Sequence, residues 1–233
     1  VLQQVENFNS PTETQNDSFK SVSKYFDRIT RPEQILSSLP QAIQTMLDPA
    51  DCGPATISMS QDVQGETFDY PEIFFEEKVH EIRRIHPDPN QIKLAADKIK
   101  NSKQPIIISG GGVLYSEAEA DLSAFAKKHN IPVTATVMGI GCMKHDDPYY
   151  ISAIGCLGEG SSNSLSKDTD LAIAIGTKLA DFTTGSWTNF QNPNFGLVSI
   201  NTSRFDTTKH RATPVISDAK VGLTQLSEEL GDW

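Results

Sequence analysis

The chain has 233 residues, enough to bury one complete core with material left over, so one to two domains are expected. Its formal charge is −10 and its Lys and Arg residues are scattered along the sequence, which argues against a nucleic-acid partner. No run approaches the roughly 18 consecutive apolar residues of a membrane span, so no membrane association is expected. Three widely spaced cysteines, an odd number, suit a reducing compartment and predict a cytoplasmic location.

The first part of the chain is mostly polar and carries no signal-peptide pattern. It does not begin with Met, and we expect the chain to be an internal part of a longer polypeptide. Residues 30–47 are the first predicted helix, with Thr30 and Glu33 as its capping box and Pro40 expected to kink or divide it. A short buried strand is predicted at 55–59. A helix followed by a strand indicates the end of an α/β unit.

Residues 73–87 mix charge with isolated aromatic side chains, which predicts a linker. A new domain is predicted from residue 88 to residue 233. Asp88 is expected to cap its first helix, with Pro89 in the first turn. The predicted buried face of this helix consists of Ile92, Ala95, Ala96 and Ile99. Only 88–233 is expected to fold alone, because 1–72 contributes too few elements to bury a core.

Strands and helices alternate in the predicted second domain. The strands are apolar runs at 105–109, 132–137, 171–175, 197–200 and 213–217. The helices include one that Ser116 and Glu119 are expected to cap, one at 159–168 and a last one that carries Ala219, Leu223, Leu226 and Leu230. Five strands with this spacing predict an α/β fold with a parallel, doubly wound sheet of the Rossmann type, preceded by a fragment of a second α/β domain.

Glycine loops stand beside the predicted strands, at positions where a doubly wound sheet binds its ligands. The candidate residues of a nucleotide-binding crevice are Gly110, Gly111, Gly112 and Gly176. A further loop, expected at the same edge, contains Gly155, Gly158 and Gly160. None of these loops forms a G-x-G-x-x-G fingerprint or a P-loop, and tight turns also require glycine. A purely structural role is therefore the favoured interpretation.

No catalytic or metal-binding residue is assigned from the pattern. The KHDD segment at 144–147 contains possible metal ligands, but four adjacent residues fit an ordinary turn better. His129 ends a predicted helix, where a cation would suit the helix dipole. No Ser, His and Asp arrangement stands out. The thiols, interpreted as buried or unreactive, belong to Cys52, Cys142 and Cys156.

Several segments, in order along the chain, resemble one family. RITRPEQILSSLPQAIQTM followed by GPATISMSQDVQ is similar to the end of the pyrimidine-binding domain of thiamine diphosphate enzymes. Four later segments are similar to the central domain of that family: QPIIISGGGV, IPVTATVMGIG, IGCLGEGSSNSLSKDTDLAIAIGTKL and TPVISDAKVGLTQL. The resemblance implies that 1–72 is the C-terminal part of the pyrimidine-binding domain and that 88–233 is the central domain.

Within the family, VSKYFDRITRPEQ and QDVQGETFDYPEIFFEEKVHEIRR look most similar to members that open a cyclic diketone in myo-inositol breakdown. This implies a hydrolase that cleaves a carbon–carbon bond of a small cyclic diketone, with thiamine diphosphate as electron sink. Magnesium would bridge the diphosphate to the protein. The resemblance also implies a homo-oligomer, a dimer or a tetramer.

The family's activating Glu and its GDG-to-Asn metal motif fall outside this chain, so the chain alone is expected to be inactive and to bind no cofactor. GEG at 158–160 with Asn189 has a similar spacing but does not directly follow a buried strand, and we interpret it as a coincidence. Many relatives end the fourth strand of the central domain with an acidic residue. This chain has Asn201 there, which predicts weak nucleotide binding.

Three alternatives stay open. The first is an acetolactate-synthase-like carboligase, which shares the three-domain plan of the family. The second is a stand-alone nucleotide-binding module, and the third is a structural spacer that carries subunit contacts. The parent sequence on both sides of the chain would separate them, because a Glu upstream and a GDG motif downstream identify the family.

Overall fold

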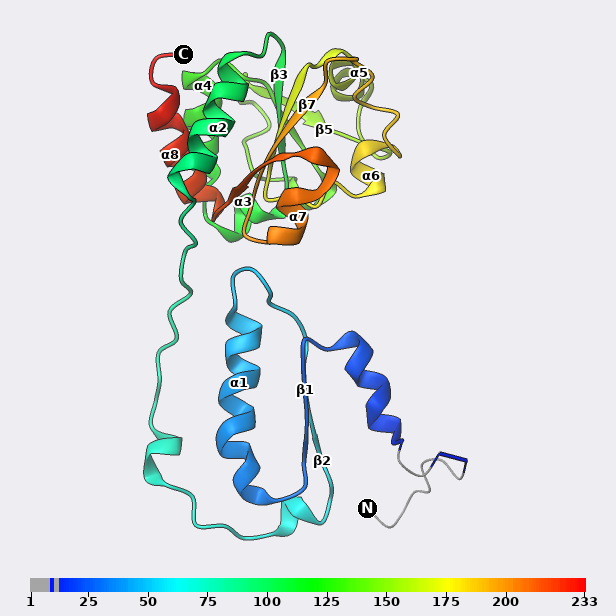
Figure 1. The fold of residues 1–233 in the computed structure, drawn as a ribbon, viewed down its shortest axis with the longest axis vertical. Helices are drawn as coiled ribbons and strands as arrows, with labels where there is room; N and C mark the ends of the chain where they lie inside the picture. Colours follow the sequence, from blue (N-terminus) through cyan, green and yellow to red (C-terminus); the bar gives the residue numbers. More distant parts are fainter. Residues whose placement is uncertain (1–8, 11–12) are drawn as a thin grey trace. The chain divides into compact units, whose positions relative to one another are not determined.

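The computed structural model describes residues 9–10 and 13–233. By its internal contacts the chain divides into two compact units, Val1–Arg83 and Arg84–Trp233. We call them unit 1 and unit 2 and describe each by itself (Figure 1). The division falls inside the predicted linker 73–87, and the assignment of the two parts to named domains stays a prediction.

Unit 1 contains two parallel strands joined by a helix. The strands β1 (Tyr25–Ile29) and β2 (Ala55–Met59) pair along their whole length, with Tyr25 opposite Ala55. The helix α1 (Ile35–Leu47) connects them and packs against both. The short 3-10 helices of the unit are η1 (Gln15–Val22), η2 (Pro32–Gln34), η3 (Val63–Gly65) and η4 (Glu72–Phe75). The strand predicted at 55–59 is confirmed, whereas β1 is a strand that the sequence analysis missed.

The strand β1 has no recognisable strand pattern in the sequence, because polar residues interrupt it. Asp27 and Arg28 interrupt the apolar residues of YFDRI, so no strand pattern stands out. In the structure, the Asp27 carboxylate accepts hydrogen bonds from the Ser38 hydroxyl of α1 and from the Tyr25 hydroxyl. The expectation of a buried β2 is wrong, because a two-stranded sheet covered by one helix leaves the strand only half-buried.

The start of α1 differs from the predicted capping box. The Gln34 Oε1 accepts from the Thr30 and Arg31 N–H groups at 2.6 and 2.9 Å, which fixes the turn η2 ahead of the helix, and α1 begins after Gln34 without a side-chain cap. The expectation that Pro40 divides the helix is also wrong, because α1 runs without a break through that residue. Pro40 is exposed, so the carbonyl that its missing N–H leaves unpaired can bind water.

Limited proteolysis with trypsin should cut the chain first between residues 76 and 83. This segment has no regular secondary structure, and Val79 and Ile82 in it are 82% and 63% exposed, so it reaches a protease active site with little unfolding. Lys78 and Arg83 are the expected cleavage sites. Mass spectrometry of the first products identifies them, and primary cleavage after Lys103 or Lys178, at the two ends of the central strands, would contradict the division into units.

Unit 2 is a six-stranded parallel sheet with the strand order β5-β4-β3-β6-β7-β8. The strands are β3 (Pro105–Ser109), β4 (Val133–Ala135), β5 (Tyr150–Ala153), β6 (Leu171–Ile175), β7 (Gly196–Asn201) and β8 (Thr213–Ile216). The helices are α2 (Pro89–Lys100), α3 (Gly111–Tyr115), α4 (Glu119–Lys128), α5 (Gly160–Asp168), α6 (Asp181–Thr184), α7 (Arg204–Thr208) and α8 (Ala219–Leu230), with the 3-10 helices η5 (Val137–Gly139) and η6 (Lys209–Arg211). The predicted doubly wound α/β class is confirmed, with six strands instead of five.

The central strands are buried on both faces, which is why their sequences are uninterrupted apolar runs. Ile107 and Ile173 belong to the core shared with α2, α4 and α8. Ile106 and Ile108 belong to the second core, on the other face. Figure 1 shows α2, α4 and α8 on one side of the sheet and α5 and α6 on the other. β3 and β6 coincide with the strands predicted at 105–109 and 171–175.

Of two helix caps predicted in unit 2, one is confirmed and one is wrong. The Asp88 carboxylate caps α2 by accepting from the Asn90 N–H at 2.8 Å, and the four apolar residues predicted for the buried face are all buried, so this prediction is confirmed. The predicted capping box of Ser116 and Glu119 is wrong. Ser116 instead ends α3, a helix that the sequence analysis missed, and its hydroxyl accepts from the Ala219 N–H at 3.3 Å.

His129 ends α4 as predicted, but the expectation of a cation there is wrong. The side chain is 4% exposed, and its two ring nitrogens lie 3.1 Å from the Trp233 carbonyl oxygen and 3.0 Å from the Ser227 hydroxyl. Burial lowers the pKa of His129 below its usual value, against the opposing effect of the Trp233 carbonyl, and the charge of Lys128 lowers it further. The imidazole is therefore neutral at pH 7.

The free energy of unfolding should fall as the pH drops below 6.5. The unfolded His129 takes up its proton near pH 6.5, whereas the folded side chain does so only at lower pH, so protons favour the unfolded state in that window. Urea midpoints at pH 7.5 and 5.5, followed by circular dichroism, measure the effect. His129→Gln should reduce the difference between the two midpoints, and its midpoint at pH 7.5 shows the loss of packing alone. An equal difference in both proteins would contradict the role of His129.

Candidate nucleotide crevice

The two main glycine loops meet at the centre of the sheet of unit 2. β3 and β6 are neighbours, and the chain continues from β3 toward β4 on one side and from β6 toward β7 on the other. Such a reversal leaves a crevice at the carboxyl ends of the two central strands. Residues 110–112 directly follow β3, and Gly176 directly follows β6. The structure thus brings the four candidate residues to one place.

These glycines allow two backbone segments to approach closely. A Cβ atom on Gly112 would lie 2.6 Å from the Gly176 Cα, and one on Gly110 would lie 2.4 Å from the Gly176 carbonyl oxygen. The Gly110 N–H donates to the Ile175 carbonyl at 2.8 Å, and the Gly112 N–H donates to the Gly176 carbonyl at 3.0 Å. Gly110 and Gly111 are buried. The N–H groups of Gly110 and Gly112, which a phosphate would need, are therefore already paired within the protein.

The further glycine loop, 155–160, is held by an asparagine. The Gly155 N–H donates to the Asn163 Oδ1, and the Asn163 Nδ2 donates to the Gly155 carbonyl, both at 2.9 Å. Asn189, 5% exposed, donates its Nδ2 to the same Asn163 Oδ1 at 3.4 Å. The amide of Asn189 thus supports the loop that contains the GEG sequence.

The end of β7 also supports neighbouring loops. The Asn201 Nδ2 donates to the Thr177 carbonyl at 3.2 Å, and its Oδ1 accepts from the Ser203 N–H at 2.9 Å. Nearby, the Lys209 ammonium donates to the Lys178 carbonyl at 2.7 Å and pairs with the Asp206 carboxylate at 2.8 Å. The Asn201 amide and the Lys209 ammonium therefore both have partners within the protein.

Groups with possible metal or nucleophile chemistry do not gather at this edge. Within the described ranges 9–10 and 13–233, no three His, Cys, Asp or Glu side chains lie together as possible metal ligands. In the 144–147 segment, the Asp147 carboxylate accepts from the Tyr149 N–H and the Ser123 hydroxyl. Burial raises the pKa of the Cys142 thiol, which keeps it protonated and unreactive. In the part of the chain that the structure describes, no helix is long and apolar enough to cross a bilayer.

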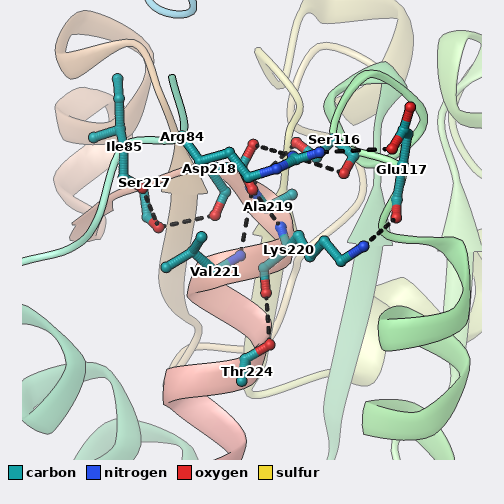
Figure 2. Close-up of polar contacts among 10 residues, drawn as sticks. All are labelled: Arg84, Ile85, Ser116, Glu117, Ser217, Asp218, Ala219, Lys220, Val221 and Thr224. Carbon is teal, nitrogen blue, oxygen red and sulfur yellow. Dashed lines mark hydrogen bonds and ion pairs between the residues drawn. The ribbon is translucent and has the colours of Figure 1, made fainter. Parts of the chain in front are cut away.

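A polar cluster at the end of β8, which the sequence analysis missed, fixes the start of unit 2 (Figure 2). The Arg84 guanidinium donates to the Asp218 Oδ2 at 3.0 Å and to the Ser116 carbonyl at 2.8 Å. The Ile85 carbonyl accepts from the Asp218 N–H at 2.9 Å and from the Ser217 hydroxyl at 3.1 Å. The other oxygen of Asp218 caps α8. No local pattern indicates these contacts, because the partners are more than 30 residues apart in the sequence.

ADP, FAD and NAD should each bind this chain with a Kd weaker than about 100 μM. The paired N–H groups of Gly110 and Gly112 leave a phosphate few donors, and the Asn201 side chain is already bonded to the Thr177 carbonyl and the Ser203 N–H. Equilibrium dialysis with the three nucleotides measures the constants. Asn201→Asp is the matched variant and should stay above the same limit, because it does not free the glycine loops. A low-micromolar constant for the unmodified chain would favour the nucleotide-binding module.

Comparisons with known proteins identify relatives along the whole chain. Residues 92–226 match the family described as thiamine pyrophosphate enzyme, central domain. A 3D-(3,5/4)-trihydroxycyclohexane-1,2-dione hydrolase from Clostridium tetani is 46% identical over 99% of the chain, and the protein of that name from Geobacillus thermodenitrificans is 41% identical over 100% of it. The chain spans 36% of the length of each of these relatives.

Solved structures share the fold. A putative thiamin diphosphate-dependent enzyme from Mycobacterium smegmatis matches 91% of this chain and 40% of its own with a TM-score of 0.71 and 19% identity. Benzoylformate decarboxylase from Polynucleobacter necessarius matches 94% of this chain and 41% of its own with a TM-score of 0.70 and 22% identity. The family match, which covers more than half of the chain, agrees with the resemblance seen in the sequence. The chain therefore belongs to the thiamine pyrophosphate enzymes, with the central domain of that family at residues 92–226.

Proposed function

We propose that this chain is part of a thiamine diphosphate-dependent hydrolase that opens the ring of trihydroxycyclohexane-1,2-dione by breaking a carbon–carbon bond. The observation that carries the proposal is the 41–46% identity, across the whole chain, to relatives named as this hydrolase. This identity extends over unit 1 as well as unit 2, so it is more specific than a match restricted to 92–226. The proposed pathway is myo-inositol breakdown.

The residues of this chain do not fit a thiamine diphosphate site. The GEG loop at 158–160 and Asn189 resemble the metal motif in spacing, but the loop follows the half-buried strand β5 rather than a buried one, and the Asn189 Nδ2 supports this loop through Asn163. When bound elsewhere in the longer protein, the cofactor supplies the electron sink for carbon–carbon cleavage. The contribution of this chain is structural: it builds the sheet of unit 2 and fixes the loops at its carboxyl edge. We assign 1–72 to the end of the pyrimidine-binding domain, 73–87 to a linker and 88–233 to the central domain.

The remaining parts of the proposal concern the longer protein. Mg²⁺ is the proposed metal, bridging the diphosphate to the protein. The proposed assembly is a homo-oligomer of two or four subunits in the cytoplasm, with a small cyclic diketone as substrate. The formal charge of −10 supports the absence of a nucleic-acid partner. A carboligase is the second candidate of the same family, and the names of the matched relatives favour the hydrolase over it.

The decisive test is an assay of the full-length protein from the source gene. With thiamine diphosphate and Mg²⁺ it should consume trihydroxycyclohexane-1,2-dione and release an open-chain acid, observed by NMR, with a cofactor-free sample as control. The 233-residue chain alone should show no turnover and no micromolar binding of the cofactor in calorimetric titration. Acetolactate formation from pyruvate, with the diketone left intact, would refute the hydrolase and favour the carboligase.

A further inference from the structure

A cavity of about 530 Å³ lies at the amino edge of the sheet of unit 2. It is lined by residues that precede the neighbouring strands β3, β6 and β7 and by residues at the end of α2. Parallel strands start at one edge of a sheet, so the cavity lies opposite the edge at which Figure 1 shows α3 and α7. We call it the amino-edge cavity. It is separate from the nucleotide crevice, which lies at the carboxyl ends of the strands.

Asp170 fixes the wall of the amino-edge cavity. Its Oδ2 accepts from the Lys103 N–H at 2.7 Å and its Oδ1 accepts from the Gln104 N–H at 3.0 Å. Both carboxylate oxygens are therefore bonded to the chain that precedes β3. The Asp170 carbonyl accepts from the Gly196 N–H at 2.8 Å, at the start of β7. The starts of β3, β6 and β7 are thus held together by this residue, and the cavity is preformed.

Lys98 brings a cation without a counter-charge to the cavity. Its half-buried side chain passes over Gly196, since a Cβ atom there would be 2.9 Å from the Lys98 Cε and 3.5 Å from its Nζ. The ammonium donates to the Thr213 hydroxyl at 3.2 Å and, among the described residues, takes part in no ion pair. An ammonium carries three N–H donors, so this one can also donate to a bound anion. Pairing a partly buried charge in this way is favourable.

The other lining groups favour a ligand with hydroxyl groups. Gln104 and Asn194 contribute exposed side-chain amides, which both donate and accept hydrogen bonds. Asn101 and Ser102, which follow α2 directly, also line the cavity, and the last carbonyls of a helix have no partner within it. These carbonyls are acceptors for hydroxyl groups. Leu171 is the one large apolar residue of the lining, and it is 1% exposed, so an apolar ligand has little surface to contact.

The charges of the cavity favour a monoanion over a phosphate. The lining has two ammonium groups, of Lys98 and Lys103, and one carboxylate, of Asp170, which leave one net positive charge. The carboxyl end of α2, which faces the cavity, carries the negative end of the helix dipole and opposes a dianion. The formal charge of −10 on the whole chain opposes it further. A single carboxylate matches this arrangement.

We propose that the amino-edge cavity binds a small polyhydroxylated carboxylate, such as a sugar acid, with the Lys98 ammonium paired to the carboxylate. The exposed Lys103 ammonium adds a second, weaker attraction for the same group. The amides of Gln104 and Asn194 and the last carbonyls of α2 bind the hydroxyl groups. The ligand bridges the starts of β3, β6 and β7 and so stabilises unit 2. The proposal concerns this unit alone and does not depend on the proposed hydrolase activity.

Titration of the 233-residue chain with D-gluconate, followed by proton–nitrogen NMR at constant ionic strength, tests the site. The amide signals of Lys103, Gln104 and Gly196 should shift and saturate with a Kd of about 1 mM. Sorbitol has the same carbon chain with a hydroxymethyl group in place of the carboxylate, and it should bind at least about ten-fold more weakly. Equal binding of sorbitol, or no saturable shift with gluconate up to about 20 mM, would overturn the proposal.

Lys98→Gln should weaken gluconate binding at least about ten-fold, because it removes the cation that pairs with the carboxylate. Lys100→Gln is the matched control: it removes the same charge from the same helix, but the Lys100 ammonium donates to the Glu229 carbonyl at 2.9 Å and does not line the cavity. This control should bind gluconate as the unmodified chain does. Equal weakening in both variants would mean that gluconate responds only to the overall charge, and the proposal would fail.

Two further measurements complete the test. Lys103→Gln changes an exposed side chain of the same cavity, so it tests the site without disturbing the packing, and it should weaken gluconate binding about three-fold. Unchanged binding in both Lys98→Gln and Lys103→Gln would place the ligand elsewhere. Inorganic phosphate is the competing probe. If phosphate shifted the same amide signals at a lower concentration than gluconate, the cavity would be a phosphate site and the proposal would be wrong.

Discussion

Gly112→Ala should lower the free energy of unfolding of unit 2 by about 3 kcal/mol. The added Cβ would lie 2.6 Å from the Gly176 Cα, a distance at which one backbone must move. Neither backbone is free to move, because the Gly112 N–H donates to the Gly176 carbonyl and the Gly176 N–H donates to the Ile200 carbonyl. The substitution therefore strains the contact between the loops after β3 and β6 and also the pairing of β6 with β7. Both tryptophans are in unit 2, so fluorescence during urea unfolding reports on this unit.

Gly160→Ala is the matched control for this experiment. A Cβ atom on Gly160 would meet no atom within 4 Å, and the residue is the first of α5. Alanine favours the helix by up to about 1 kcal/mol, so the control should be as stable as the unmodified chain or slightly more stable. If Gly112→Ala unfolded at the same urea concentration as the control, the close contact of the two loops would not be required for the fold.

The strands buried on both faces could be located from the sequence, and the two strands that the sequence analysis missed, β1 and β5, are only partly buried. PIIIS and LAIAI are continuous apolar runs because helices cover both faces of the central sheet, and their predicted limits are those of β3 and β6. β5 lies at the edge of the sheet and is only partly buried, and its pairing with β4 is irregular at Val133 and Thr134. An edge strand needs fewer apolar residues, so YISA gave no clear signal.

The candidate crevice shows the same division between local and distant information. The local sequence alone predicts that the glycines lie at strand ends. The reversal of chain direction across the sheet, between the neighbouring strands β3 and β6, brings them together. Whether their N–H groups are free depends on carbonyls more than 60 residues away, such as the Ile175 carbonyl that accepts from Gly110. The role of Asn201 as a support for the Thr177 loop likewise depends on a contact between neighbouring strands. Sequence patterns locate such a site but do not reveal which of its polar groups are already paired.

Asp218→Ala should lower the free energy of unfolding of unit 2 by about 2.5 kcal/mol, the second-largest effect expected here. Asp218 is 7% exposed and has two roles: its Oδ1 accepts from the Lys220 N–H at 3.0 Å and caps α8, and its Oδ2 accepts from the Arg84 guanidinium at 3.0 Å. The cap contributes about 1 kcal/mol. The bond to the half-exposed guanidinium contributes about 1.5 kcal/mol more.

Asp218→Asn separates these two roles. Asparagine caps helices as well as aspartate does, so this variant should keep the cap and lose only the ionic bond to Arg84, a loss of about 1.5 kcal/mol. Arg84→Met removes the same bond from the other side, so a double variant with Asp218→Asn should cost less than the two single changes added together. Urea unfolding followed by tryptophan fluorescence gives all four values. Additive losses would mean that Arg84 and Asp218 are not coupled, and that the start of unit 2 is held by the Ile85 carbonyl and the Ser217 hydroxyl instead.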